Sequence, residues 1–165
     1  MSDMFHDEIP KHYIGKMIDV MLEADRHTYQ VLTKRPERMS RLLHREFKEA
    51  AKASHIWWGT SVENLKHGVP RIDMLRDADA KVPWLSIEPL LEDLGELDLD
   101  GIKWVVVGGE SGKGCRPMEA DWVRSIRDQS EDAGIPFFFK QWGGFPKKKN
   151  GRMLDGRTWD EFPIV

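Results

Sequence analysis

The chain has 165 residues, 40% of them hydrophobic and 32% charged, a composition typical of a soluble globular domain and not of a disordered chain. Its formal net charge is −3, so the overall charge does not indicate a nucleic-acid partner or an anionic membrane surface. It has a single cysteine, no signal peptide and no apolar run near the roughly 20 residues of a membrane span, which predicts a cytoplasmic protein without an internal disulfide.

The first half of the chain alternates patterns typical of helices and strands. Pro10, a favoured first residue of helices, precedes an apolar stripe at helical spacing. Pro36 opens a second helix in the same way, directly after a short apolar run. The predicted elements are a helix over residues 9–25, a strand over 28–32, a helix over 36–50, a strand over 56–60 and a helix over 70–75.

The second half of the chain continues this alternation with three more strands. The most pronounced run covers residues 102–107 and stops abruptly at two glycines. A helix follows, and Gly134 with Pro136 gives it the expected end. The acidic connection over residues 92–100 is predicted to hold at most one helical turn. The predicted elements are strands over 82–87, 102–107 and 137–139 and a helix over 119–133, with Val123, Ile126, Ser130 and Ala133 facing inward.

Five strands that alternate with helices predict a parallel sheet with right-handed crossovers. No Gly-x-Gly-x-x-Gly follows the first strand, which favours part of a (β/α) barrel over a dinucleotide-binding sheet. We therefore predict an α/β fold in which residues 1–144 form a partial (β/α) barrel of about five parallel strands with flanking helices. Residues 145–165 carry the turn signals Asn150-Gly151 and Asp155-Gly156 and predict a C-terminal hairpin tail, with residues 147–149 as a solvated lysine turn.

Polar residues follow every predicted strand, and in a parallel barrel these positions converge on one face. Three carboxylates near two lysines and an arginine can bind a zwitterionic ligand or shift one another's pKa, and helix caps with salt bridges are the open alternative. The catalytic candidates are Glu88, Glu110 and Lys140. The ligand-binding candidates are Thr33, Lys34, Arg35, Ser61, Glu63, Ser86, Glu88, Gly108, Gly109, Glu110, Ser111, Lys140 and Gln141.

Other common site motifs are absent from the sequence. A phosphate-binding Walker loop ending at Gly112-Lys113 would need a glycine where Val107 stands and a serine or threonine where Gly114 stands. Cys115 has no histidine near it in sequence to act as a base, and the six histidines show no metal-ligand spacing. We therefore predict no metal site and no cofactor bound by this chain alone.

Six blocks of the sequence resemble a phage and prophage protein family of unknown function. The resemblance spans essentially the whole chain, in the same order. The blocks cover residues 31–39, 58–64, 85–91, 106–112, 139–143 and 154–159.

Full-length members of that family resemble radical S-adenosylmethionine (SAM) enzymes and carry an upstream three-cysteine segment. The resemblance implies SAM and an iron–sulfur cluster for those relatives only, with the polar strand ends lining the cavity. Residues 2–6 resemble an internal family motif, so the chain is expected to match the C-terminal two-thirds of a member. Without the cysteines it is expected to be inactive alone, and to self-associate through an exposed barrel edge.

Two other functions remain open at this point, and whether the chain is an enzyme is undecided. One is a cluster-independent barrel enzyme that uses paired carboxylates at the rim. The other is a non-enzymatic phage interaction module with an exposed face rich in tryptophan and a basic hairpin. The seven tryptophans are interpreted chiefly as bulky core residues.

Overall fold

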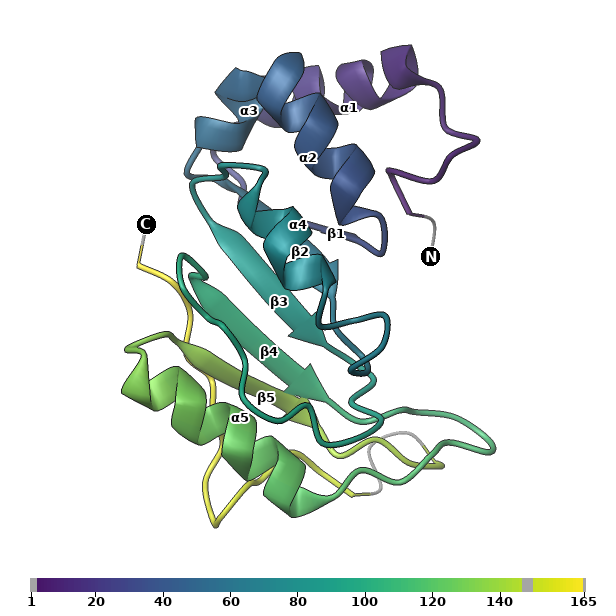
Figure 1. The fold of residues 1–165 in the computed structure, drawn as a ribbon, viewed down its shortest axis with the longest axis vertical. Helices are drawn as coiled ribbons and strands as arrows, with labels where there is room; N and C mark the ends of the chain where they lie inside the picture. The colour runs from purple at the N-terminus through teal and green to yellow at the C-terminus, as the bar shows by residue number, and fades with distance from the viewer. Residues whose placement is uncertain (1–2, 147–149, 165) are drawn as a thin grey trace.

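The computed structural model describes residues 3–146 and 150–164, which fold into five strands and five helices; no helix separates β3 from β4 (Figure 1). The lysine turn predicted at residues 147–149 lies outside the described residues. The elements in order are α1 (Lys11–Glu23), β1 (Tyr29–Thr33), α2 (Pro36–Arg45), α3 (Lys48–Lys52), β2 (Ile56–Ser61), α4 (Arg71–Arg76), β3 (Pro83–Ile87), β4 (Trp104–Gly108), α5 (Ala120–Asp132) and β5 (Phe137–Gln141).

The five strands form one parallel sheet in the order β1-β2-β3-β4-β5. Sequential order with crossovers of one hand keeps every crossover on the same side of the sheet, whereas a doubly wound sheet reverses its order and places helices on both sides. This confirms the predicted α/β class and gives the strand arrangement of a partial (β/α) barrel, with β1 and β5 as its edges.

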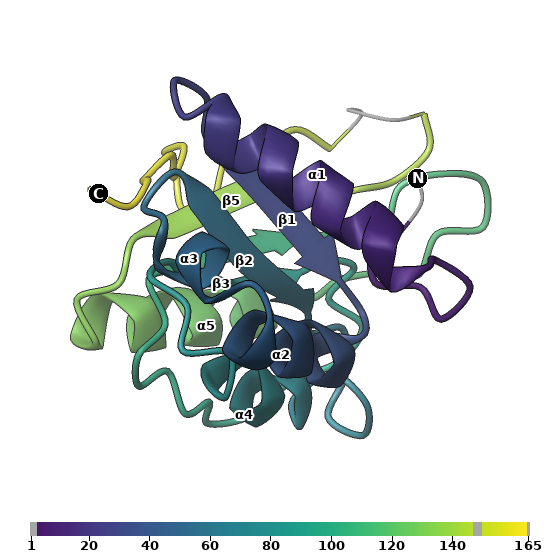
Figure 2. The same cartoon turned by 90° about the horizontal axis from the view of Figure 1, so that it is seen from above.

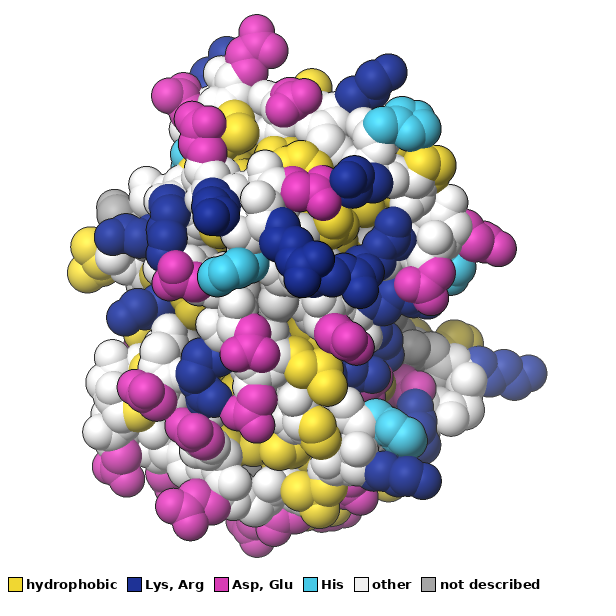
Figure 3. All heavy atoms as spheres, turned by 45° about the horizontal axis from the view of Figure 1, so that its top comes forward, with side chains coloured by type: hydrophobic (Ala, Val, Ile, Leu, Met, Phe, Trp, Pro, Cys, Tyr) yellow, Lys and Arg dark blue, Asp and Glu magenta, His cyan; other side chains and the backbone are white. Residues whose placement is uncertain are grey.

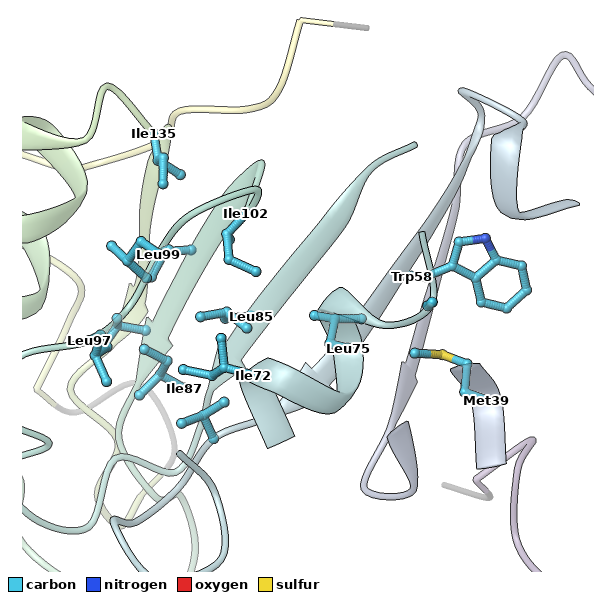
Figure 4. Close-up of a cluster of buried hydrophobic side chains, with 14 of the residues drawn as sticks. Met39, Trp58, Ile72, Leu75, Leu85, Ile87, Leu97, Leu99, Ile102 and Ile135 are labelled. Atoms are coloured by element: carbon cyan, nitrogen blue, oxygen red, sulfur yellow. The ribbon is translucent and has the colours of Figure 1, made fainter. Parts of the chain in front are cut away.

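One face of the sheet packs against the helices (Figure 1). Every second strand residue points to this side and joins the buried side chains of α1, α2, α4 and α5 in one core. Figure 4 shows Leu85 and Ile87 of β3 beside Ile72 and Leu75 of α4. The segment between β3 and β4 adds Leu94, Leu97 and Leu99 to the same core.

The opposite face, called here the helix-free face, is built from the alternate strand residues. Trp57, Trp84 and Trp104 are at most 5% exposed and form a second buried cluster there. Their rings contact one another, with centroids 5.5 Å apart for Trp57 and Trp104 and 5.3 Å apart for Trp84 and Trp104. We call these three residues the tryptophan floor. Phe162 of the C-terminal segment stacks on it, 5.1 Å from Trp104.

Two local expectations are wrong, at residues 36–50 and at Ala133. The helix predicted over residues 36–50 is two helices, because the backbone turns at Glu46 and Phe47, where α2 ends and α3 begins. Residues 92–100 form no helix, within the expected limit of one turn; their leucines are buried and their acids mostly exposed, which suits an extended segment lying on the core. Ala133 is exposed, because α5 ends one residue earlier and Ala133 is its C-cap.

The C-terminal segment is a tight turn that continues along β5, not a free-standing hairpin. Leu154 and Arg157 form one antiparallel bridge around Asp155-Gly156. Further on, the Phe139 N–H donates to the Trp159 carbonyl oxygen at 2.9 Å, and Phe138 forms an antiparallel bridge with Asp160. The segment thus covers the outer edge of β5. The domain boundary at residues 144 and 145 stays a prediction.

The outer surface over the helices carries mixed charge. Figure 3 shows Lys and Arg side chains in a band across this face, with acidic side chains among them and below. Residues 34–52 hold seven Lys or Arg and three Glu, while residues 92–100 hold five acids and no Lys or Arg. In the part of the chain that the structure describes, no helix is long and apolar enough to cross a membrane.

Candidate functional site

Most of the predicted site residues lie at the carboxyl ends of the strands, which form one rim of the sheet. They separate into four groups, each held around one carboxylate. One group lies on the helix-free face, one follows β2 and reaches the first residue of α4, one lies on the side of the core, and one lies in the loop that follows β4.

The first group joins the ends of β3 and β5 around Glu88. Lys140 Nζ donates to Glu88 Oε2 at 2.7 Å, and Gln141 Nε2 donates to Glu88 Oε1 at 2.6 Å. Gly108 of β4 lies between them, where a Cβ would come 3.2 Å from Gln141 Nε2 and 3.3 Å from the Glu88 carboxyl carbon. The absence of a side chain at Gly108 therefore lets the three polar groups meet across β4. The peptide bond between Glu88 and Pro89 is cis.

Ser61 and Ser86 lie one step below this group on the same face. They are partners in the register of β2 and β3, and each side chain is 4% exposed. Within the described residues, neither hydroxyl has a hydrogen-bond partner in the protein. Strand alternation places the tryptophan floor on the same face, one row further from the rim, with Trp84 two residues before Ser86. The site thus has an aromatic base, hydroxyl groups above it and charges at the rim.

The second group is centred on Glu63, which follows β2. Glu63 Oε1 accepts from Lys34 Nζ at 2.5 Å, and Oε2 accepts from Arg71 Nη1 at 2.7 Å. Arg71 also donates to the Ser61 carbonyl oxygen at 2.9 Å. Burial raises the pKa of Glu63, but the Lys34 hydrogen bond and the charge of Arg71 outweigh it, so the pKa lies below its ordinary value. Sequence reasoning missed Arg71, which is the first residue of α4, eight positions after Glu63.

The third group is centred on Asp3 and holds Thr33 and Arg35 away from the helix-free face. Asp3 Oδ1 accepts from the Thr33 hydroxyl at 2.7 Å, and Oδ2 accepts from Arg35 Nη1 at 2.9 Å. Burial raises the pKa of Asp3, but these bonds and two backbone N–H donors outweigh it and lower the pKa. Thr33 is buried on the core side, so the structure does not bring it to the Glu88 group. Asp3 was not among the predicted residues.

The fourth group lies in the loop after β4. The Arg116 guanidinium donates two hydrogen bonds to Glu110, each of 2.8 Å, and its backbone N–H donates a third. These bonds lower the pKa of Glu110 to about 2. Ser111 forms a parallel bridge with Gly144. Gly109 permits a close backbone passage here, because a Cβ on it would lie 2.1 Å from the Trp142 carbonyl oxygen.

The geometry determines which protonation states the rim offers. Each of the four carboxylates is paired with a Lys or Arg, and Asp3, Glu63 and Glu110 have lowered pKa values. Asp3, Glu63 and Glu110 are therefore ionised near neutral pH and can hold a cation or accept hydrogen bonds, but they do not supply protons. The rim is thus suited to binding a charged ligand rather than to general acid catalysis.

Of two hollows in the surface, one lies beside a rim group and the other lies away from the rim. One, of about 360 Å³, adjoins the loop after β4 and is lined by Cys115, Arg116, Trp142 and Asn150. Another, of about 640 Å³, lies at the opposite end of the sheet between the β3–β4 segment and the end of α5, far from the strand ends. No group of three His, Cys, Asp or Glu able to hold a metal ion is found within residues 3–146 and 150–164.

A model of the family described as "Protein of unknown function (DUF5131)" matches residues 1–163. A search of curated proteins found no match.

Proposed function

The chain belongs to the DUF5131 family of unknown function, and we propose that it is a cytoplasmic, phage-type member that resembles radical-SAM proteins and binds SAM on its helix-free face. The observation that carries this proposal is the Glu88 group, in which a carboxylate, an ammonium and an amide from β3 and β5 meet above two hydroxyls. The phage origin and the radical-SAM relationship rest on the six sequence blocks described above.

The chemistry of the rim fits the charged end of SAM. SAM carries an α-ammonium, an α-carboxylate, ribose hydroxyls and a sulfonium. Glu88 can accept from the ammonium, and Lys140 can pair with the carboxylate once the present ion pair opens. The Ser61 and Ser86 hydroxyls, free of protein partners among the described residues, can bond the ribose. The Glu88 carboxylate and the Lys140 ammonium already lie side by side. A bound zwitterion therefore replaces their single ion pair by two, one between its ammonium and Glu88 and one between its carboxylate and Lys140.

An iron–sulfur cluster does not fit the residues of this chain. Clusters of the three-cysteine kind need three thiolates, and the 165 residues contain only Cys115. Cys115 lines the hollow beside Arg116, not the Glu88 group. We therefore propose that these residues bind SAM without cleaving it reductively, and that any cluster would require ligands from elsewhere.

Isothermal titration calorimetry with SAM tests the proposal. We expect measurable heat and an increase in melting temperature with the native chain. Glu88→Gln should weaken binding about tenfold or more, because one ionic hydrogen bond is worth roughly 1.5–3 kcal/mol. Glu49→Gln is the matched control, since Glu49 is exposed and makes no ion pair among the described residues. Absence of both heat and thermal shift for the native chain would refute the proposal.

The two other functions receive less support. A hydrolase with paired rim carboxylates needs a protonated partner, and Glu110 is held ionised by Arg116. An interaction module with an exposed tryptophan face receives little support, because five of the seven tryptophans are buried and Trp122 and Trp142 are partly buried. The lysine turn at residues 147–149, the basic part of that hairpin, lies outside the described residues.

A further inference from the structure

Strand β5 carries an irregularity directly before its last residue. Val107 of β4 pairs with Phe139 in the register, but the next residue, Gly108, pairs with Gln141, so Lys140 is skipped. One extra residue opposite a regular strand is a β-bulge, which bends the chain and redirects the side chains that follow it. Bulges of this kind are frequent next to binding sites, and this one lies at the rim of the sheet.

The bulge explains how two consecutive residues reach one carboxylate. In a regular strand, Lys140 and Gln141 would point to opposite faces of the sheet. Phe138 packs on the helix-free face and Phe139 in the core, so strict alternation would send Gln141 to the core side. Both side chains instead donate to Glu88, Lys140 at 2.7 Å and Gln141 at 2.6 Å. The bulge is therefore what brings Gln141 into the Glu88 group.

The hydrogen bonds of Gln141 determine which way round its amide lies. Nε2 donates to Glu88 Oε1 at 2.6 Å and to the Gly109 carbonyl oxygen at 3.2 Å. A carboxylate and a carbonyl oxygen only accept hydrogen bonds, so the reversed amide would turn its own oxygen toward two other oxygens. The Gly109 N–H also donates to the Gln141 carbonyl oxygen at 2.9 Å, which fixes the backbone at this point. The protein thus uses both donors of the amide nitrogen.

The amide oxygen is the unused part of this side chain. Gln141 Oε1 has no hydrogen-bond partner within residues 3–146 and 150–164. Every enclosed side-chain oxygen in that part of the chain has a partner, so Oε1 is accessible to a ligand. It is a neutral acceptor held beside the Glu88 carboxylate, whereas the neighbouring Lys140 only donates.

We propose that Gln141 is a specificity-determining residue of this site, whose Oε1 accepts a hydrogen bond from a primary ammonium group that pairs with Glu88. The inference rests on the proposed SAM site and assigns a ligand class to it. That class is the primary α-amino acid zwitterion, with its ammonium between Glu88 and Gln141 and its carboxylate on Lys140. A ligand without the ammonium leaves both acceptors without a donor, which costs binding free energy.

A primary ammonium fits the two acceptors better than other donors do. It has three N–H groups, so it can donate to Glu88 and to Gln141 Oε1 at the same time. A hydroxyl group has one donor and can serve only one of them. An acylated nitrogen has lost its positive charge and therefore the ionic part of its bond to Glu88.

Calorimetric titration with two probes tests the inference. The probes are SAM and the analogue of SAM that carries a hydrogen atom in place of the α-ammonium group. We expect the native chain to bind SAM at least about tenfold more tightly than the analogue, because hydrogen bonds between a charged donor and its acceptors are the stronger ones.

The variant Gln141→Lys separates the two halves of the amide. Lysine keeps a donor for Glu88 and Gly109 but has no acceptor. We expect it to weaken SAM about tenfold and to leave binding of the analogue unchanged or tighter, since the added charge attracts the carboxylate of both probes. Gln30→Lys is the matched control: it adds the same charge at an exposed glutamine near the amino end of β1, and both affinities should stay within about twofold.

The outcomes distinguish this inference from the proposed function. If the native chain binds neither probe, both fail. If it binds the two probes equally, the SAM site stands and the assignment of Gln141 is wrong. Equal weakening of both probes by Gln141→Lys would show that the residue only supports the structure of the site, and an undiminished preference for SAM in that variant would show that Oε1 takes no part; either result overturns the inference.

Discussion

The indole of Trp84 lies directly against the backbone of Gly59, so that a Cβ on Gly59 would come 2.3 Å from the Trp84 ring. The two residues are register partners on β2 and β3, and Trp84 Nε1 donates to the Trp57 carbonyl oxygen at 3.2 Å. Glycine at this position is what allows the Trp84 indole to lie against β2.

Substitution of Gly59 by alanine is therefore expected to destabilise the fold. Trp84 is 5% exposed and lies against Trp104, so it cannot move aside without disturbing the floor. We expect a loss of about 1–3 kcal/mol in the free energy of unfolding, measured by urea titration. Gly15→Ala is the control: its Cβ meets only ordinary contacts in a helix, and stability should be unchanged or rise by up to about 1 kcal/mol. An unchanged free energy of unfolding in Gly59→Ala would mean that the tryptophan floor is loosely packed.

Removal of the Glu63 carboxylate should cost more than removal of an exposed glutamate. Glu63→Ala leaves Arg71 without its partner, and the side chains of both residues are largely buried, at 11% and 16% exposure. Lys34 is half-exposed, so water can solvate its ammonium once Glu63 is removed. We therefore expect the free energy of unfolding, measured in urea, to fall by about 2 kcal/mol, which is less than for breaking a fully buried ion pair. Glu49→Ala, on the exposed side of α3, should change stability by less than about 0.5 kcal/mol. Similar losses in the two variants would contradict this assignment.

A side chain introduced at Gly108 should weaken ligand binding while leaving the stability of the fold nearly unchanged. The atoms closest to a new Cβ, Gln141 Nε2 and the Glu88 carboxyl group, belong to side-chain ends that can shift. Gly108→Ala is therefore expected to change the free energy of unfolding by less than about 1 kcal/mol while weakening SAM binding about tenfold. Calorimetry and urea titration on the same sample measure both quantities. Unchanged affinity would place the ligand away from the Glu88 group.

The ion pairs of Asp155 predict a stability difference that depends on pH. Arg124, and then Arg127, lowers the pKa of Asp155 from 3.8 to about 2. A carboxyl group with a lowered pKa stabilises the fold fully above its unfolded pKa, and this contribution is lost as pH falls through the folded pKa. Asp155→Asn should therefore lower the melting temperature at pH 7 and at pH 5, and the gap to the native chain should narrow between about pH 4 and pH 2.

Two features make Asp155→Asn a clean test. Asparagine tolerates the positive φ of 52° at this position, so the turn is retained. Asp132→Asn is the control, because Asp132 is exposed and makes no ion pair among the described residues. If the difference in melting temperature between Asp155→Asn and the native chain stays constant from pH 7 to pH 3, the destabilisation comes from the turn and not from the lost charge.

The sheet was predictable because its signals are local. Each strand is a short apolar run ended by polar residues, and alternation assigns Trp57 and Trp58 to opposite faces without further information. The break between α2 and α3 was missed because neither glycine nor proline marks it; the turn occurs at Glu46 and Phe47. Tertiary contacts of Phe47, not local propensity, decide where the helix ends.

The pairing within the rim could not be read from the sequence. Glu88 and Lys140 are 52 residues apart, and only the register of β3, β4 and β5 brings them together. Arg116 was visible beside Cys115, but nothing in the sequence marks it as the partner of Glu110 rather than of the thiol. Positions at strand ends were thus predictable as a set, and their ionic partners were not.

The tryptophan floor also has a spectroscopic consequence. The Trp104 ring centroid lies 5.5 Å from that of Trp57 and 5.3 Å from that of Trp84, on the face that also carries Ser61 and Ser86. Indoles at such distances exchange excitation energy and respond together to a change in polarity above them. The chain therefore contains an unlabelled optical reporter at the site itself, and occupancy of the rim can be followed through its intrinsic emission.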